Sequence, residues 1–106
     1  MASVADSTER RDALVERLFM NAIGAFDLFS VYVGERLGLY RIMADQGPLT
    51  SAELAHAARV HERYAREWLE QQAVAGFLTV DVPNAAANER RYRLPAAHRP
   101  PRGLRR

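Results

Sequence analysis

Two short helical segments separated by a tight turn constrain this chain most strongly. Thr50 and Glu53 have the spacing of a capping box, which predicts a helix over 51–58. The two residues that follow fit a turn, and a second helix is predicted over about 61–75. Gly76 then stands where a left-handed residue ends a helix. Together these signals predict a helix-turn-helix.

The residues after this pair of helices predict a β-hairpin. The run over 77–82 is rich in β-branched and aromatic residues, and the run over 91–94 alternates between polar and apolar residues. Between them, 83–90 is a polar loop that contains Pro, Asn and Ala. The order of helix, turn, helix and hairpin predicts a winged helix-turn-helix, because all the local signals agree with that one arrangement.

Two apolar helical stretches precede this unit. Apolar residues recur at helical spacing over 8–25 and over 27–37, and the spacing of Asp6 and Glu9 is that of a capping box at the start of the first stretch. Gly24 either breaks the two stretches apart or lies inside one long bent helix. We therefore expect a mainly α fold with a small β-hairpin, in which a winged helix-turn-helix is preceded by one or two long apolar helices.

The charge divides the chain into an acidic body and a basic tail. Residues 1–89 hold eight arginines and thirteen acidic residues, a net charge of −5, whereas 90–106 hold seven arginines and no acid. The tail over 96–106 is rich in Arg and Pro and is expected to be disordered, as is the N-terminus over 1–8. The winged-helix domain with its helical extension is expected over 9–95.

The most apolar segment, 18–34, is at the lower edge of membrane-spanning length. Asp27 near its middle argues against a membrane span, because burial of a carboxylate in lipid is costly. For Asp27 itself, an N-cap at the start of the second helical stretch is a simpler explanation than a functional buried acid. We expect this segment to be buried in protein, and we expect a cytoplasmic location because no secretory signal precedes it.

No catalytic, cofactor-binding or metal-binding residue is predicted. Gly34 and Gly38 form the nearest glycine pair to a nucleotide-binding motif, but no strand precedes them, which favours helix packing or a helix end. His56 and His61 do not have the spacing of a helical metal pair, and the chain contains no cysteine.

A helix-turn-helix raises the possibility of DNA binding. The second helix, however, has a net charge of −1 over 61–72, which is the wrong sign for phosphate contacts. A small DNA-binding transcriptional regulator is therefore the alternative function. Its contacts would be made by Arg59, Arg63, Arg66, Arg90 and Arg91.

The N-terminal helices are more apolar than the winged helix needs for its own core. The second helix of the helix-turn-helix already supplies a core stripe of Tyr64, Ala65, Trp68, Leu69 and Ala73. The surplus apolar surface favours oligomerisation, a homodimer through the N-terminal helices, or ligand contact. The residues predicted for such contacts are Phe19, Phe26, Phe29 and Tyr32.

Several short runs spread over about 9–98 match the pattern of a known family. They are Leu18-Phe19, Asp27-Leu28, the run from Ser30 to Tyr40, the run from Gly47 to Thr50, His61 to Tyr64, Arg66 to Ala73, and Arg91 to Pro95. In these runs the chain resembles the N-terminal region of class I S-adenosylmethionine-dependent methyltransferases that carry a winged-helix domain. The most specific part of the likeness is the run from 66 to 76.

The resemblance implies a domain that dimerises and forms a lid over the substrate pocket of a C-terminal Rossmann-like domain. That domain and its cofactor motif have no counterpart in this sequence, so no cofactor is expected in this chain, and S-adenosylmethionine would belong to the full-length parent enzyme. The chain is expected not to be an enzyme by itself. Because the likeness is lost after His98, we expect a truncated gene whose reading frame shifts near Ala97.

Overall fold

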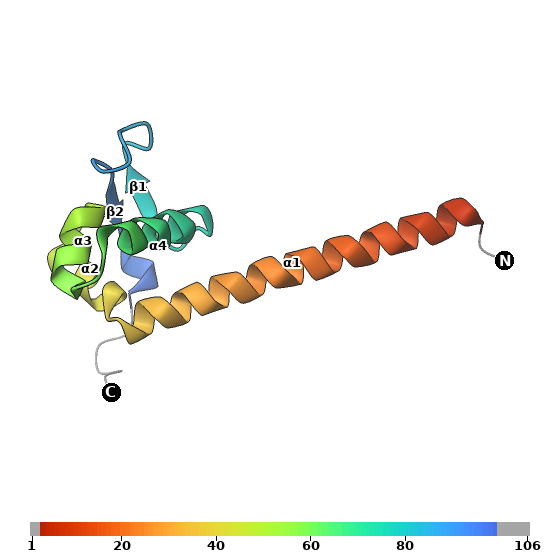
Figure 1. Ribbon diagram of the computed structural model, residues 1–106, viewed down its shortest axis with the longest axis horizontal. Coiled ribbons are helices and arrows are strands. Elements are labelled where there is room, and N and C mark those ends of the chain that lie inside the picture. Colours follow the sequence, from red (N-terminus) through yellow and green to blue (C-terminus); the bar gives the residue numbers. More distant parts are fainter. Residues whose placement is uncertain (1–2, 100–106) are drawn as a thin grey trace.

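The computed structural model describes residues 3–99, in which a small winged-helix body lies at one end of a long helix (Figure 1). The body contains three short helices and an antiparallel hairpin, and the long helix projects away from it. In chain order the elements are α1 (Val4–Arg36), α2 (Leu39–Gln46), α3 (Ser51–Ala58), α4 (Glu62–Val74), β1 (Thr79–Asp81), β2 (Arg91–Arg93) and a short 3₁₀ helix (Ala96–His98).

Helix α1 begins at Val4, earlier than the sequence predicted. Its N-cap is Ser3, whose Oγ accepts a hydrogen bond from the backbone N–H of Asp6 at 3.2 Å, while the Asp6 carboxylate accepts one from the backbone N–H of Ser3 at 3.4 Å. Asp6 is therefore the third helical residue (N3), which closes the box, and its assignment as the residue that opens a box was wrong. The prediction of disorder was also wrong for residues 4–8, which are helical; residues 1–2 lie outside the described residues.

Helix α1 is continuous across Gly24, so the two predicted stretches form one helix of 33 residues, about 50 Å long at 1.5 Å per residue. A glycine costs only about 1 kcal/mol relative to alanine inside a helix, which the flanking turns outweigh. Asp27 lies inside this helix, and its predicted role as an N-cap was wrong. Its carboxylate accepts a hydrogen bond from Gln71 Nε2 at 2.7 Å.

The helix-turn-helix forms as the sequence predicted. The Thr50–Glu53 capping box opens α3, Arg59 turns the chain with a left-handed φ of 59°, and Gly76 follows α4 with a φ of 86°. The backbone N–H of Thr50 donates to the Glu53 carboxylate at 2.9 Å. This hydrogen bond, assisted by the guanidinium of Arg91, lowers the pKa of Glu53 below its usual value.

The predicted hairpin is present, but its strands are shorter than the runs over 77–82 and 91–94 that predicted them. The backbone N–H groups of Phe77 and Leu78 both donate to the carbonyl of Gln72, at 3.0 and 3.3 Å, so the start of the β-rich run closes the end of α4. A backbone bridge from Leu49 to Tyr92 widens the sheet, with N···O distances of 3.0 and 2.8 Å.

The core lies between α2, α3, α4 and the hairpin. Trp68 and Leu69 are buried, as predicted, but Tyr64 is 70% exposed and does not belong to the core stripe. Helix α1 covers Trp68 and leaves Tyr64, one turn earlier, uncovered. The buried apolar residues are Leu39, Met43, Leu49, Leu54, Ala55, Ala65, Trp68, Leu69, Leu78, Tyr92 and Leu94.

The predicted tail begins later than expected. Residues 96–98 form a 3₁₀ helix, in which His98 Nδ1 lies 2.9 Å from the carbonyl oxygen of Phe77. The expected disorder over 96–106 is therefore wrong for this first turn, and residues 100–106 lie outside the described residues.

Candidate functional site

Helix α1 packs on the body through a polar seam, which we define as Asp27 and Ser30 of α1 with Trp68, Gln71 and Gln72 of α4. Besides the Asp27–Gln71 bond, Gln72 Nε2 donates to Ser30 Oγ at 2.9 Å and Trp68 Nε1 donates to the Ser30 carbonyl at 2.9 Å. Gln72 is fully buried. These bonds satisfy the buried polar groups and fix the rotation of α1 about its own axis.

Gly34 lets α1 approach the body closely. A Cβ at this position would lie 2.4 Å from Trp68 Cζ2 and 2.7 Å from Tyr40 Cε2. The Trp68 and Tyr40 rings pack edge to face, with their centroids 5.2 Å apart. The Tyr40 hydroxyl donates to Gln72, and burial raises the pKa of Tyr40 to about 12. Gly38, with a φ of 72°, ends the segment between α1 and α2. The glycine pair therefore serves helix packing and a helix end, as predicted.

The opposite side of α1 carries a broad apolar face, which we call the outer face. At 100° per residue, it points away from the polar seam and from the body. Its large side chains are 47–73% exposed, an unusual display of apolar surface on a monomer. The outer face consists of Leu14, Val15, Leu18, Ala22, Ala25, Phe26, Phe29 and Tyr32.

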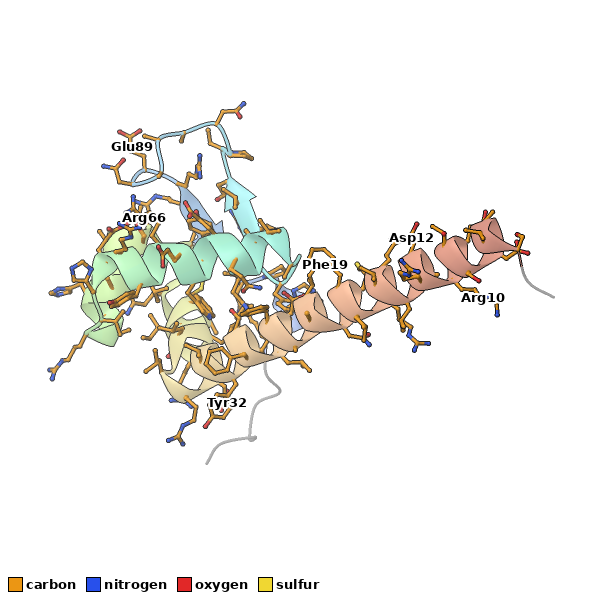
Figure 2. The ribbon with its side chains drawn as sticks, turned by 45° about the vertical axis from the view of Figure 1, so that its right-hand side comes forward. Arg10, Asp12, Phe19, Tyr32, Arg66 and Glu89 are labelled. Atoms are coloured by element: carbon orange, nitrogen blue, oxygen red, sulfur yellow. The ribbon has the colours of Figure 1, made fainter. Side chains whose placement is uncertain are left out.

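The four predicted contact residues all lie exposed on α1, at 64% for Phe19, 73% for Phe26, 65% for Phe29 and 58% for Tyr32. Helical spacing places Phe29 near the middle of the outer face and Phe26 towards one side. Phe19 and Tyr32 project from opposite sides of the helix (Figure 2). Their role in partner contact stays a prediction.

The aliphatic half of the outer face was not among the predicted site residues. Leu18 lies eleven residues before Phe29, and Val15 fourteen before it, which places both on the same side of the helix. This helical repeat was the available signal. The aromatic residues of the repeat were predicted as contacts, whereas its aliphatic residues were assigned no role.

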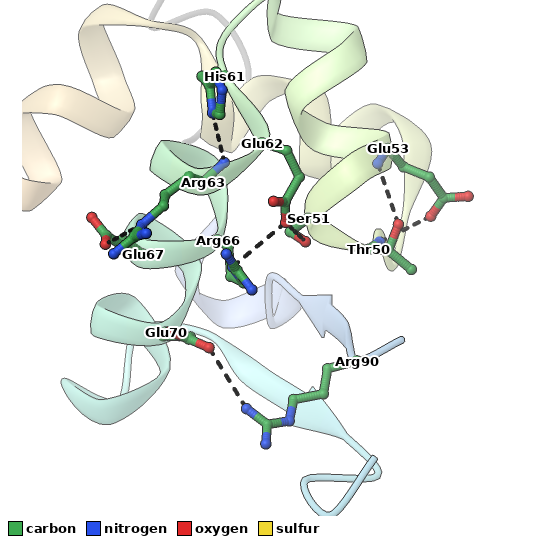
Figure 3. Close-up of polar contacts among 10 residues, drawn as sticks. All are labelled: Thr50, Ser51, Glu53, His61, Glu62, Arg63, Arg66, Glu67, Glu70 and Arg90. Carbon is green, nitrogen blue, oxygen red and sulfur yellow. Dashed lines mark hydrogen bonds and ion pairs between the residues drawn. The ribbon is translucent and has the colours of Figure 1, made fainter. Parts of the chain in front are cut away.

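The solvent side of α4 carries its own counter-charges (Figure 3). Arg63 Nε lies 3.1 Å from Glu67 and Arg66 Nε lies 3.6 Å from Glu62, both one turn apart on the helix. Buried Ser51 donates to Glu62 at 2.6 Å and so ties this carboxylate to α3. Two of the arginines in the DNA-binding alternative therefore face carboxylates of their own helix.

The arginines next to the hairpin loop are paired in the same way. Arg90 lies 3.7 Å from Glu70 of α4, and its Nε donates to the Ala85 carbonyl at 3.0 Å, which holds the loop against α4. Arg91 lies 3.0 Å from Glu53. Exposed ion pairs of this kind contribute at most about 1 kcal/mol each, but they lower the positive potential that would attract phosphate.

The described part of the chain contains no other site with an evident chemistry. Between residues 3 and 99, no three His, Asp or Glu side chains lie close enough together to hold a metal ion. No helix in this range combines the length and apolarity that a membrane span requires. A shallow hollow at the junction of α1 and α2 is lined by Glu35, Arg36, Leu37, Gly38 and Arg41.

The fold and the site define a winged helix-turn-helix domain with an exposed apolar helix. Residues 25–100 match the Rv2258c-like winged HTH domain, and the chain belongs to this family. No curated protein matches the chain at a significant level.

Solved structures of methyltransferases match over their N-terminal portions. The apo form of the S-adenosylmethionine-dependent methyltransferase SibL is 30% identical, with a TM-score of 0.61 over 81% of this chain and 22% of that chain. The mitomycin 7-O-methyltransferase MmcR is 26% identical, with a TM-score of 0.68 over 85% of this chain and 25% of that chain. The chain thus spans about a quarter or less of the length of these enzymes.

A third structure shares the fold alone. RV1404 from Mycobacterium tuberculosis is 18% identical, with a TM-score of 0.50 over 93% of this chain and 69% of that chain. The chain is therefore a winged HTH domain similar to the N-terminal parts of S-adenosylmethionine-dependent methyltransferases.

Proposed function

We propose that the chain is a non-catalytic dimerisation and substrate-lid domain that corresponds to the N-terminal part of a small-molecule S-adenosylmethionine-dependent methyltransferase. One observation carries the proposal: α1 contacts its own domain through the polar seam and the close packing at Gly34, and turns its broad apolar side outward. A helix of this kind needs a second protein surface, and the likeness to methyltransferase N-terminal regions indicates which kind of protein supplies it.

The energetics favour a covered outer face. Complete burial of a Leu or Phe side chain contributes roughly 1.5–3 kcal/mol, and the outer face exposes at least half of Leu18, Phe26 and Phe29. Most helical stability in proteins comes from packing of an apolar face, and the first turns of α1 project from the body (Figure 1). Association through the outer face would both bury these side chains and support the projecting part of α1.

In this proposal the chain holds no cofactor and no catalytic residue. A dinucleotide-type site needs a strand followed by a glycine-rich turn into a helix. The strands of the described residues form an antiparallel hairpin, and the Gly34–Gly38 pair lies at the end of α1. S-adenosylmethionine would instead be bound by the Rossmann-like domain of the longer enzyme. The outer face and Phe19 would lie beside the interface that the two domains share.

A chimeric enzyme tests the lid role. The N-terminal quarter of the mitomycin 7-O-methyltransferase is replaced by this chain, and methyl transfer and mass are measured. We expect a dimeric, active chimera, and loss of both properties with Phe29→Glu on the outer face. Val74→Glu is the matched control, because Val74 is 91% exposed on α4, away from the outer face. A chimera that folds and retains full activity with Phe29→Glu would refute the role.

A DNA-binding regulator remains the alternative function, and a gel shift at several salt concentrations separates the two. The ion pairs of Arg63 and Arg66 favour weak binding to duplex DNA, with a shallow dependence on salt. Tight binding with a steep salt dependence, lost when both arginines are replaced by alanine, would reverse the ranking.

A further inference from the structure

We infer that two copies of this chain pair their α1 helices antiparallel, with Ala22 of one copy facing Ala22 of the other. The inference rests on the proposed function, because it specifies how the outer face is covered. It follows from how side-chain size and charge are distributed along α1.

Side-chain size changes along the outer face. Its N-terminal part carries Val15 and Leu18, its middle carries Ala22, and its C-terminal part carries Phe26 and Phe29. An antiparallel pair centred on Ala22 sets Val15 of one copy against Phe29 of the other, so aliphatic meets aromatic at both ends. A parallel pair sets the smaller aliphatic side chains against each other at one end and the larger aromatic side chains against each other at the other end, so its two ends require different distances between the helices.

One pair of opposite charges, Arg10 and Glu35, favours the same orientation. Arg10 and Glu35 are 25 residues apart, almost seven helical turns, and therefore lie on the same flank of α1. None of the ion pairs among residues 3–99 involves either of them. The antiparallel pair brings Arg10 of each copy to the level of Glu35 of the other. A parallel pair in register places like charges at the same level.

Cysteine cross-linking tests the orientation, because the chain has no cysteine of its own. The full chain is made as three single variants, Val15→Cys, Ala22→Cys and Phe29→Cys. Each variant is oxidised alone. Val15→Cys and Phe29→Cys are also mixed and oxidised together, with one of the two carrying a size tag. Thr79→Cys on β1 is the control, and its cross-linking measures how often disulfides form by random collision.

The antiparallel pair predicts that Ala22→Cys cross-links with itself and that Val15→Cys cross-links with Phe29→Cys. It also predicts little self-cross-linking of Val15→Cys and of Phe29→Cys. In each of these variants the two copies of the cysteine lie about 21 Å apart along the helix axis, too far for a disulfide. Efficient self-cross-linking of Val15→Cys and Phe29→Cys would overturn the orientation and leave the dimer intact. A monomeric mass with no cross-link at Ala22 would overturn both the orientation and the proposed function.

A charge exchange gives a second readout without disulfides. Arg10→Glu and Glu35→Arg should each weaken dimerisation about 2- to 5-fold at low salt, since each breaks two symmetric pairs, and the double variant should restore it. A double variant that dimerises more weakly than both single variants would contradict antiparallel pairing, whatever the cross-linking of the mixed variants shows.

Discussion

Replacing Gly34 by alanine tests whether the close approach of α1 to the body is as tight as the structure shows. The added Cβ would lie 2.4 Å from Trp68 Cζ2 and 2.7 Å from Tyr40 Cε2, well inside van der Waals contact. Both rings are held in place by hydrogen bonds, Trp68 to the Ser30 carbonyl and Tyr40 to Gln72. An outward shift of the helix by about 1 Å would lengthen the bond between Trp68 and Ser30, which lies on α1 itself, and a shift of the Tyr40 ring would strain its bond to Gln72.

The expected change in the free energy of unfolding combines two destabilising effects and one stabilising effect. Overpacking of a filled site costs about 1–3 kcal/mol, and loss of either hydrogen bond adds about 1 kcal/mol. The higher helix propensity of alanine returns about 1 kcal/mol. We expect Gly34→Ala to lower the free energy of unfolding by about 2 kcal/mol.

Gly24→Ala is the matched control, because both glycines lie in α1 and a Cβ at Gly24 meets no atom within 4 Å. It should raise the free energy of unfolding by up to about 1 kcal/mol. Urea denaturation at one fixed protein concentration, followed by fluorescence of Trp68, the only tryptophan, measures both changes. Equal stabilities of the two variants would refute the tight packing at Gly34.

Two further predictions concern groups with shifted pKa values. Tyr40→Phe leaves buried Gln72 without a partner for its Oε1 and should cost about 1–3 kcal/mol. The pKa of Tyr40 rises from 10.0 to about 12 on folding, so the wild type should lose stability progressively above pH 10. Urea titrations at several pH values should show a smaller loss in the Tyr40→Phe variant. Glu53→Gln should cost several tenths of a kcal/mol at pH 7, because Thr50 and Arg91 favour the ionised carboxylate. That difference should shrink as the pH falls below 4.5 through the lowered pKa, and thermal melts at pH 7 and pH 3 check it.

The winged helix-turn-helix could be predicted from sequence because its signals are local. A capping box at Thr50 and Glu53 and a glycine stop at Gly76 each act within a few residues, and all of them agree with the structure. The helix start was misplaced because Ser3 and Asp6 form a second box one turn earlier. The role of Asp27 was missed because its partner, Gln71, lies 44 residues away in the sequence.

The candidate site was predicted only in part. Helical spacing and size identified Phe26 and Phe29, but the direction in which the apolar face points depends on which side of α1 the body occupies. That side is set by Gly34 and Ser30, through contacts with α4 that no local pattern records. The pairing of Arg66 with Glu62 could have been predicted, because residues one turn apart on a helix are neighbours.

The mass of the full chain in solution, measured by light scattering over a range of micromolar concentrations, tests the central claim most directly. We expect a dimer, and we expect Phe29→Glu to weaken it by at least about 100-fold, because each copy loses roughly 1.5–3 kcal/mol of apolar burial and must bury a carboxylate. Val74→Glu should leave the dimer unchanged. A folded monomer at every concentration, with the outer face open to solvent, would contradict the account.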